Sequence, residues 1–333
     1  MLNKHTIMKY FIPTLMSISF LLTACGSDNT NTIVSDNTDD GDATTTPCTK
    51  IINVDTSRGD CNETLSFNPL FTMSSANDIR TIKTNNIPAH KVGKFGAGQG
   101  SLNPHAIAPL DITYNIDLTP ATNTNFTSLL RDSGGIAYSF GVLLNGIELD
   151  PVAAEPWPHS DLKGADPNAN WNWNLEALNT NLGLDCSNAH VQSTGQYHHH
   201  GSPTLYLESL NIDATTMTLI GYAADGFPIY YKYAYTDANN ASSGTAIMTS
   251  SYRLKTGDRP GDGESEPCGA YTGVYTNDYE YVQGLGTLDE ANGRTGVTPE
   301  YPSGTYYYVV TDEFPSIPRY FKGTPSQDFR IGG

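Results

Sequence analysis

The residues best suited to chemistry in this sequence are three histidines that lie close together along the chain, His190, His198 and His200. They belong to segment 185–203, which reads DCSNAHVQSTGQYHHHGSP. Imidazole nitrogen is a frequent ligand of zinc and copper, and three neutral imidazoles with one open position are typical of catalytic zinc sites. Whether these side chains can share one ion depends on the backbone that positions them.

Two short strands are predicted around these histidines, at residues 189–192 and 196–200. A three-residue loop that ends in glycine joins them, which is a known type of β-hairpin connection. In that register His190 lies directly opposite His198, and His200 lies two residues further along the same face. Directly opposed residues have Cβ atoms about 5 Å apart, so we expect the three imidazoles to bind one divalent metal ion, zinc or copper.

The sequence leaves two alternatives to this arrangement. A loop of two or four residues would pair His190 with His199 instead of His198. The histidines would also fit a polar core without a metal, in which they form hydrogen bonds or stack with tyrosines. In the three-residue register, Tyr197 and His199 lie on the opposite face of the hairpin.

Carboxylates elsewhere offer further candidate sites. Asp225, followed by glycine in a predicted turn, is the candidate catalytic residue. It would complete the metal site or orient a histidine, or else only cap the turn. Oxygen ligands suited to calcium occur in two loops, one with Asp289, Glu290 and Asn292 and the other with Asp258, Asp262, Glu264 and Glu266. Neither loop has EF-hand spacing, so exposed loops without an ion are the alternative.

Familiar catalytic motifs are absent from the sequence. No nucleophile elbow, no Walker loop and no His-Glu-x-x-His zinc motif occurs. The three tryptophans, Trp157, Trp171 and Trp173, together with 20 tyrosines, would line a sugar or peptide groove or belong to the core.

The strand pattern predicts a mainly β fold, that is, a β-rich α+β single domain with long ordered loops and few short helices. Short runs rich in Tyr, Val and Ile alternate with turns, which fits the 31 glycines and 20 prolines. The clearest strand candidates are residues 111–118, 136–144, 217–222, 228–233 and 305–311. One helix is predicted, at residues 173–178.

The first residues have the features of a secretory leader. Lys4 and Lys9 precede an apolar run at residues 10–22, which is too short for a spanning helix. The run ends in Leu-Thr-Ala-Cys, which resembles a bacterial lipobox, so we expect cleavage after residue 24 and lipidation of Cys25. A plain secretory peptide is the alternative. Glycine at position 26 favours the outer membrane by analogy with enteric sorting, and the lipid would anchor the protein to the membrane of the cell envelope.

The leader is followed by a predicted tether and a predicted folded domain. Residues 25–47 are rich in Asn, Thr, Asp, Ser and Gly and have too little apolar surface to fold, whereas residues 48–333 form the β-rich domain. The formal net charge is −17, which argues against nucleic acid as a partner. The sequence identifies no substrate and no protein partner.

Four cysteines remain if Cys25 carries lipid. In an oxidising compartment they predict two disulfides, with three pairings available. The expected pairs are Cys48 with Cys61 and Cys186 with Cys268. Their spacing matches no zinc motif.

The histidine segment also carries a resemblance to a known family. Its Ala-His-Val-Gln run, followed by Tyr-His-His-His at residues 197–200, resembles the motif of the YHYH family of exported bacterial proteins, with a histidine in place of the second tyrosine. Further similar stretches, among them GYAADGFPIY and GTYYYVVT, occur in order over about residues 138–329. The resemblance implies one domain and a shared histidine motif, and it implies no reaction because the family has no established activity.

Three functions follow from these features. The first is a cell-envelope lipoprotein that binds a divalent metal ion through its three histidines. The second is a metal-dependent hydrolase that uses the same ion to activate water. The third is a cell-surface interaction or adhesion module in which the histidines only build the core.

Overall fold

The run of residues richest in Tyr and Val forms the centre of the β structure. In the computed structural model, which describes residues 48 and 50–331, the segment TYYYVV forms strand β18 (Thr305–Val310), and five of its six residues are buried. A continuous apolar run of this kind fits a strand that is covered on both faces. The predicted β-rich class is confirmed, because the described residues form mostly strands and loops with one six-residue α-helix, α1 (Thr204–Ser209).

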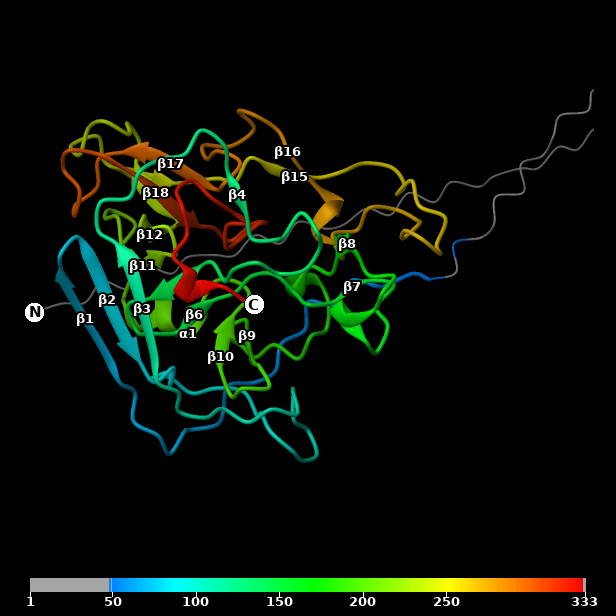
Figure 1. Cartoon of the computed structure of the whole chain (residues 1–333). Helices are drawn as coiled ribbons and strands as arrows, with labels where there is room; N and C mark the ends of the chain where they lie inside the picture. Colours follow the sequence, from blue (N-terminus) through cyan, green and yellow to red (C-terminus); the bar gives the residue numbers. More distant parts are fainter. Residues whose placement is uncertain (1–47, 49, 332–333) are drawn as a thin grey trace, which may run out of the picture. The chain divides into compact units, whose positions relative to one another are not determined.

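The largest sheet has eight strands and carries the histidine hairpin at one edge (Figure 1). Its order is β17 (Gly293–Gly296), β18, β12 (Pro228–Tyr231), β11 (Leu219–Ala223), β5 (Gly141–Leu143), β6 (Glu148–Leu149), β10 (Tyr197–His199) and β9 (Ala189–Val191). Strand β10 pairs antiparallel with β9 and parallel with β6. The motif strand is therefore held on both sides, although it lies next to the sheet edge.

A second sheet of three strands packs on the same core. It consists of β1 (Phe71–Ala76), β2 (Ile79–Thr84) and β3 (Ile112–Asp117). Alternate residues of β2 and β3 are buried, and Ile82 and Ile116 join the hydrophobic cluster that contains Val142 of the large sheet. Tyr114 stacks on Phe329, with 4.3 Å between the ring centroids. This alternation is typical of a sheet with one face on the core.

The remaining elements are short. Four two-stranded pairs complete the β structure: β4 (Thr127–Ser128) with β19 (Tyr320–Phe321), β7 (Pro156–Trp157) with β8 (Asn170–Asn174), β13 (Tyr233–Tyr235) with β14 (Thr245–Ile247), and β15 (Tyr252–Leu254) with β16 (Tyr279–Tyr281). Single 3₁₀ turns cover Lys163–Ala165, Ala177–Asn179, Thr276–Asp278 and Gln327–Phe329. Long ordered loops connect these elements, as the sequence predicted.

The predicted helix at residues 173–178 is wrong. Trp173 and Asn174 belong to strand β8, and only Ala177–Asn179 form a 3₁₀ turn. Asn174 pairs with Pro156 of the neighbouring strand. A helical spacing of apolar residues over one and a half turns is too short a signal to outweigh this tertiary pairing.

The four remaining cysteines form two disulfides, but the predicted pairing is wrong. Cys48 is bonded to Cys268 and Cys61 to Cys186, with Cα–Cα distances of 5.7 and 5.6 Å. The segment before the first sheet runs along the hairpin region, where the amide of Gly59 donates to the carbonyl oxygen of Leu184. This contact brings Cys61 next to Cys186, which is 125 residues away in the sequence.

The described residues, 48 and 50–331, belong to one compact unit. The predicted leader, Cys25 and the tether at 25–47 lie outside the described residues. Within the described part of the chain, no helix has the length and apolar character needed to cross a membrane.

Candidate metal centre

The hairpin that carries the histidines has the predicted register. His190 pairs directly with His198, and the amide of Gln192 donates to the carbonyl oxygen of Gln196 at 2.9 Å, which closes a three-residue loop. The last loop residue, Gly195, has a φ of 90°, and a Cβ there would come within 2.7 Å of Ala108 Cβ. Glycine is therefore required at this position, and it fixes the loop length that brings His190 and His198 together.

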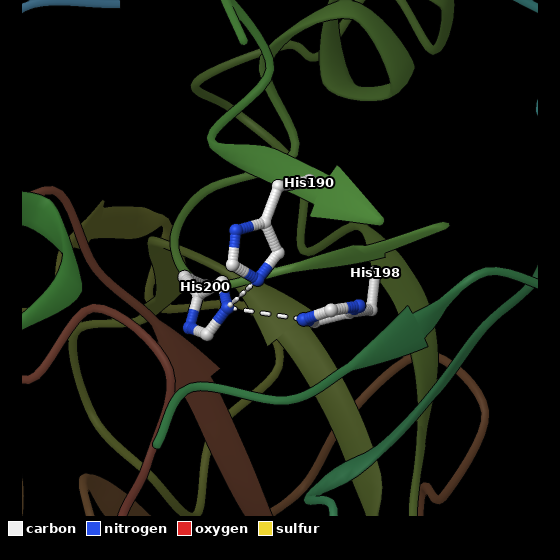
Figure 2. Close-up of side chains that lie close together, drawn as sticks. All are labelled: His190, His198 and His200. Carbon is white, nitrogen blue, oxygen red and sulfur yellow. Dashed lines mark hydrogen bonds between the residues drawn. The ribbon is translucent and has the colours of Figure 1, made fainter. Parts of the chain in front are cut away.

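The three imidazoles meet at their Nε2 atoms, as Figure 2 shows. Nε2 of His200 lies 3.0 Å from Nε2 of His198 and 3.0 Å from Nε2 of His190. In a tetrahedral zinc site with Zn–N bonds of about 2.0–2.1 Å, neighbouring nitrogens are about 3.3 Å apart. Two of the three nitrogen–nitrogen distances are thus close to those of a zinc site, and the ligand atoms of all three histidines lie within 4.8 Å of one another.

Backbone acceptors orient two of the rings. Nδ1 of His190 lies 2.9 Å from the carbonyl oxygen of Leu182, and Nδ1 of His198 lies 3.3 Å from that of Gln196. A neutral ring that donates from Nδ1 has a lone pair on Nε2. Both lone pairs face Nε2 of His200, which can donate a proton to only one of them. A cation bound by all three nitrogens would remove this conflict, so the donor set fits a metal.

The environment keeps these imidazoles neutral. Burial lowers the pKa of His190, and burial followed by the charge of His190 lowers the pKa of His198 and His200 well below the usual value. Neutral imidazole is the form that binds metal ions.

Tyr197 and His199 lie on the opposite face of the hairpin, as predicted, and both form hydrogen bonds there. Tyr197 donates its hydroxyl to Asp185 Oδ2 at 2.9 Å, and Nδ1 of His199 contacts the carbonyl oxygen of Ser187 at 2.8 Å. Burial lowers the pKa of His199 to about 3, so this ring is neutral as well. His199 is thereby separated from the cluster of three.

A cavity of about 320 Å³ opens beside the cluster. All three histidines line it, together with Asp150, Glu155, Lys163 and the exposed His105. Glu155 forms an ion pair with Lys163 at 2.7 Å, and its charge acts on His190. An ion held by the histidines would therefore face a water-accessible space that contains carboxylates.

Two further carboxylates lie on the histidine face of the large sheet. Glu148 pairs with His198 across β6 and β10, and Asp150 follows two residues later. Burial raises the pKa of both, and Asp150 accepts a hydrogen bond from Gln192 at 3.3 Å. Sequence reasoning missed this pair, although the Glu-Leu-Asp spacing, which places both acids on one face of a strand, was available.

Asp225 does not contact the histidines. It lies in the turn between β11 and β12, where Oδ2 accepts hydrogen bonds from the Tyr308 hydroxyl at 2.5 Å and the Gly323 amide at 2.8 Å. It is also not among the residues that line the histidine cavity. The geometry at Asp225 corresponds to the structural alternative, a buried turn carboxylate.

Two of the candidate calcium ligands, Asp262 and Asp289, accept hydrogen bonds from nearby protein groups. Asp262 accepts amide hydrogen bonds from Glu264 and Ser265, each at 2.8 Å, and Asp289 accepts from Gly293 at 2.9 Å and from the Tyr306 hydroxyl. Within residues 48 and 50–331, the group of at least three His, Cys, Asp or Glu side chains that converges on one point is the histidine cluster.

Comparison with known proteins identifies the family. Searches of curated proteins and of solved structures found no match. The sequence model of the family described as "YHYH protein" matches residues 113–323, which is more than half of the chain and includes the whole histidine hairpin. The chain therefore belongs to the YHYH family.

Proposed function

We propose that the protein is a cell-envelope lipoprotein whose YHYH domain binds one divalent metal ion, zinc or copper, through His190, His198 and His200. The observation that carries this proposal is the convergence of three Nε2 atoms, in which Nε2 of His200 lies 3.0 Å from each of the other two and two rings are oriented through Nδ1 by backbone carbonyls. Zinc ligands commonly have such a second partner, which fixes the tautomer and the ring orientation.

The metal would have an open coordination position. Three protein ligands leave a fourth site, and the cavity of about 320 Å³ gives it access to solvent. Histidines that only build the core would be packed on all sides without a cavity. The cavity therefore favours metal binding over the adhesion module.

The cavity also supports a second function, a metal-dependent hydrolase. A bound zinc ion would supply water with a lowered pKa as a nucleophile. Glu155 lines the cavity and would accept a proton there, while Lys163 holds it by the ion pair at 2.7 Å. Glu155 thus takes the catalytic role that the sequence suggested for Asp225, which does not line this cavity. The test is hydrolysis of p-nitrophenyl acetate and bis(p-nitrophenyl) phosphate by the metal-loaded protein. Activity that is lost in Glu155→Gln, while the metal stays bound, would support the hydrolase. No activity on either compound would count against the hydrolase.

The lipid anchor is a proposal from sequence. The leader ends in Leu-Thr-Ala-Cys, so lipid on Cys25 would hold the domain at the outer membrane through the tether at 25–47. Acylation of Cys25 would also explain why the other four cysteines pair among themselves.

Metal content tests the main proposal. The full chain, purified without a histidine tag, should contain or take up about one zinc or copper ion per molecule. The double variant His198→Ala/His200→Ala should lose it, whereas His105→Ala, which removes an exposed histidine of the same cavity, should keep it. No bound ion after reconstitution with either metal would contradict the proposal and leave the adhesion module as the working account.

A further inference from the structure

A second cavity, separate from the histidine site, has aromatic walls. It encloses about 450 Å³ where β8, β15 and β16 meet the loop before β19. Its half-buried rings are Trp171, Tyr252, Tyr279, Phe314 and Tyr320. An adjoining hollow of about 650 Å³ shares Trp171 and Tyr320 with it, so the two form one extended groove.

The walls of this groove are held in place by packing. A Cβ at Gly134 would lie 2.8 Å from Cδ1 of Trp171, and a Cβ at Gly164 would lie 2.5 Å from its Cζ2. Both positions are glycine, so the indole fits closely against the two backbones. Phe314 stacks on Tyr279 with the ring centroids 3.9 Å apart and the planes 4° from parallel. The aromatic surfaces are thus preorganised, which reduces the entropy lost when a ligand binds.

The floor of the groove contains buried polar atoms without partners. Arg319 is 8% exposed and Asn174 is 2% exposed, and both line the cavity. Nε and Nη1 of Arg319 and Oδ1 of Asn174 have no hydrogen-bond partner among the described residues. These atoms are buried in the ligand-free protein, and leaving such a group unpaired costs about 1–3 kcal/mol, so a ligand hydroxyl that reached one of them would gain that energy.

The chemistry of this floor favours hydroxyl groups over an anion. Arg319 is already neutralised by Glu176, whose Oε2 lies 2.8 Å from Nη2, and Glu266 adds a carboxylate to the lining. A hydroxyl both donates and accepts, so one ligand can serve Arg319 and Asn174 together. The apolar face of a sugar ring matches the aromatic walls. We infer that this groove binds a neutral saccharide.

Titration with defined sugars tests this inference. Cellohexaose, chitohexaose and mannohexaose are added to the full chain and followed by calorimetry and by tryptophan fluorescence. At least one should bind with a Kd of about 10 μM to 1 mM. Trp171→Ala should weaken binding at least about tenfold, and so should Arg319→Lys, which keeps the charge beside Glu176 but loses the planar donors. Tyr233→Ala, which removes a half-buried tyrosine outside the groove, should bind like the wild type.

A second variant keeps the indole in the protein and changes only its position. Gly164 has no positive φ, and a Cβ there would lie 2.5 Å from Cζ2 of Trp171, so Gly164→Ala should displace the indole and weaken binding while circular dichroism stays unchanged. The inference is overturned if none of the three sugars binds at about 10 mM, a concentration at which even millimolar affinity is visible. It is also overturned if Trp171→Ala and Arg319→Lys bind as well as the wild type, or if an unrelated decapeptide binds in the groove and the sugars do not.

Discussion

Replacement of Asp185 should destabilise the protein, and the loss of stability should grow with the number of its hydrogen bonds that the new side chain cannot form. This fully buried carboxylate lies just before the histidine hairpin. Its Oδ1 accepts the amides of Ser187 at 2.9 Å and Ala189 at 3.2 Å, and its Oδ2 accepts the amide of Gly93 at 3.0 Å and the hydroxyl of Tyr197 at 2.9 Å. The carboxylate therefore joins the start of β9, strand β10 and the segment around residue 93.

The number of bonds lost sets the expected magnitudes. Tyr197→Phe removes one bond to a charged group and should lower the free energy of unfolding by about 2 kcal/mol. Asp185→Asn keeps the Oδ1 pair, and the Tyr197 hydroxyl can turn to accept, but the Gly93 amide is left facing an N–H, so about 3 kcal/mol is expected. Asp185→Ala leaves three buried amides unpaired and should cost at least about 4 kcal/mol.

Urea unfolding followed by tryptophan fluorescence measures these differences, with the exposed Asp161→Asn as a control that should match the wild type. Since Asp185 fixes the hairpin, metal affinity should fall in the same order as stability. An Asp185→Asn protein within about 0.5 kcal/mol of the wild type would refute the reasoning, because a buried amide cannot satisfy four donors.

The double variant Cys61→Ala/Cys186→Ala removes a disulfide that joins residues 125 positions apart. The chain-entropy model predicts that the free energy of unfolding, measured with urea, falls by about 5 kcal/mol. An unchanged urea midpoint would contradict this pairing. Burial raises the pKa of Asp225 from 3.8 to about 6, so the native state binds the proton more tightly than the unfolded chain. Stability should therefore be largest below about pH 4 and fall by about 3 kcal/mol as the pH rises through 6, relative to Asp225→Asn; a parallel pH dependence of both proteins would disprove this. Cys25→Ser should abolish incorporation of labelled palmitate and release the protein from membranes, and continued labelling would exclude Cys25 as the lipidated residue.

The register of the hairpin was predictable because its causes are local. Loop length, the glycine at position 195 and the two-residue period of a strand together place His190 opposite His198. The central strand β18 was also visible as an uninterrupted run of Tyr and Val. In both cases neighbouring residues along the chain carry the whole signal.

The features that sequence reasoning missed depend on distant segments. The disulfide partners are 220 and 125 residues apart, and no local pattern decides between three pairings. The helix predicted at 173–178 fails because β8 pairs with β7 instead. Glu148 lies beside His198, and Asp150 lines the histidine cavity, only because β6 pairs in parallel with β10, which brings together residues about fifty positions apart.

The geometry of a bound ion tests the central claim most directly. Zinc K-edge absorption spectroscopy of the zinc-loaded full chain should show three imidazole nitrogens at about 2.0–2.1 Å and one further light atom. His198→Ala should lower the imidazole count to two. A site with at most one imidazole, or a count that does not change in His198→Ala, would contradict metal binding by His190, His198 and His200.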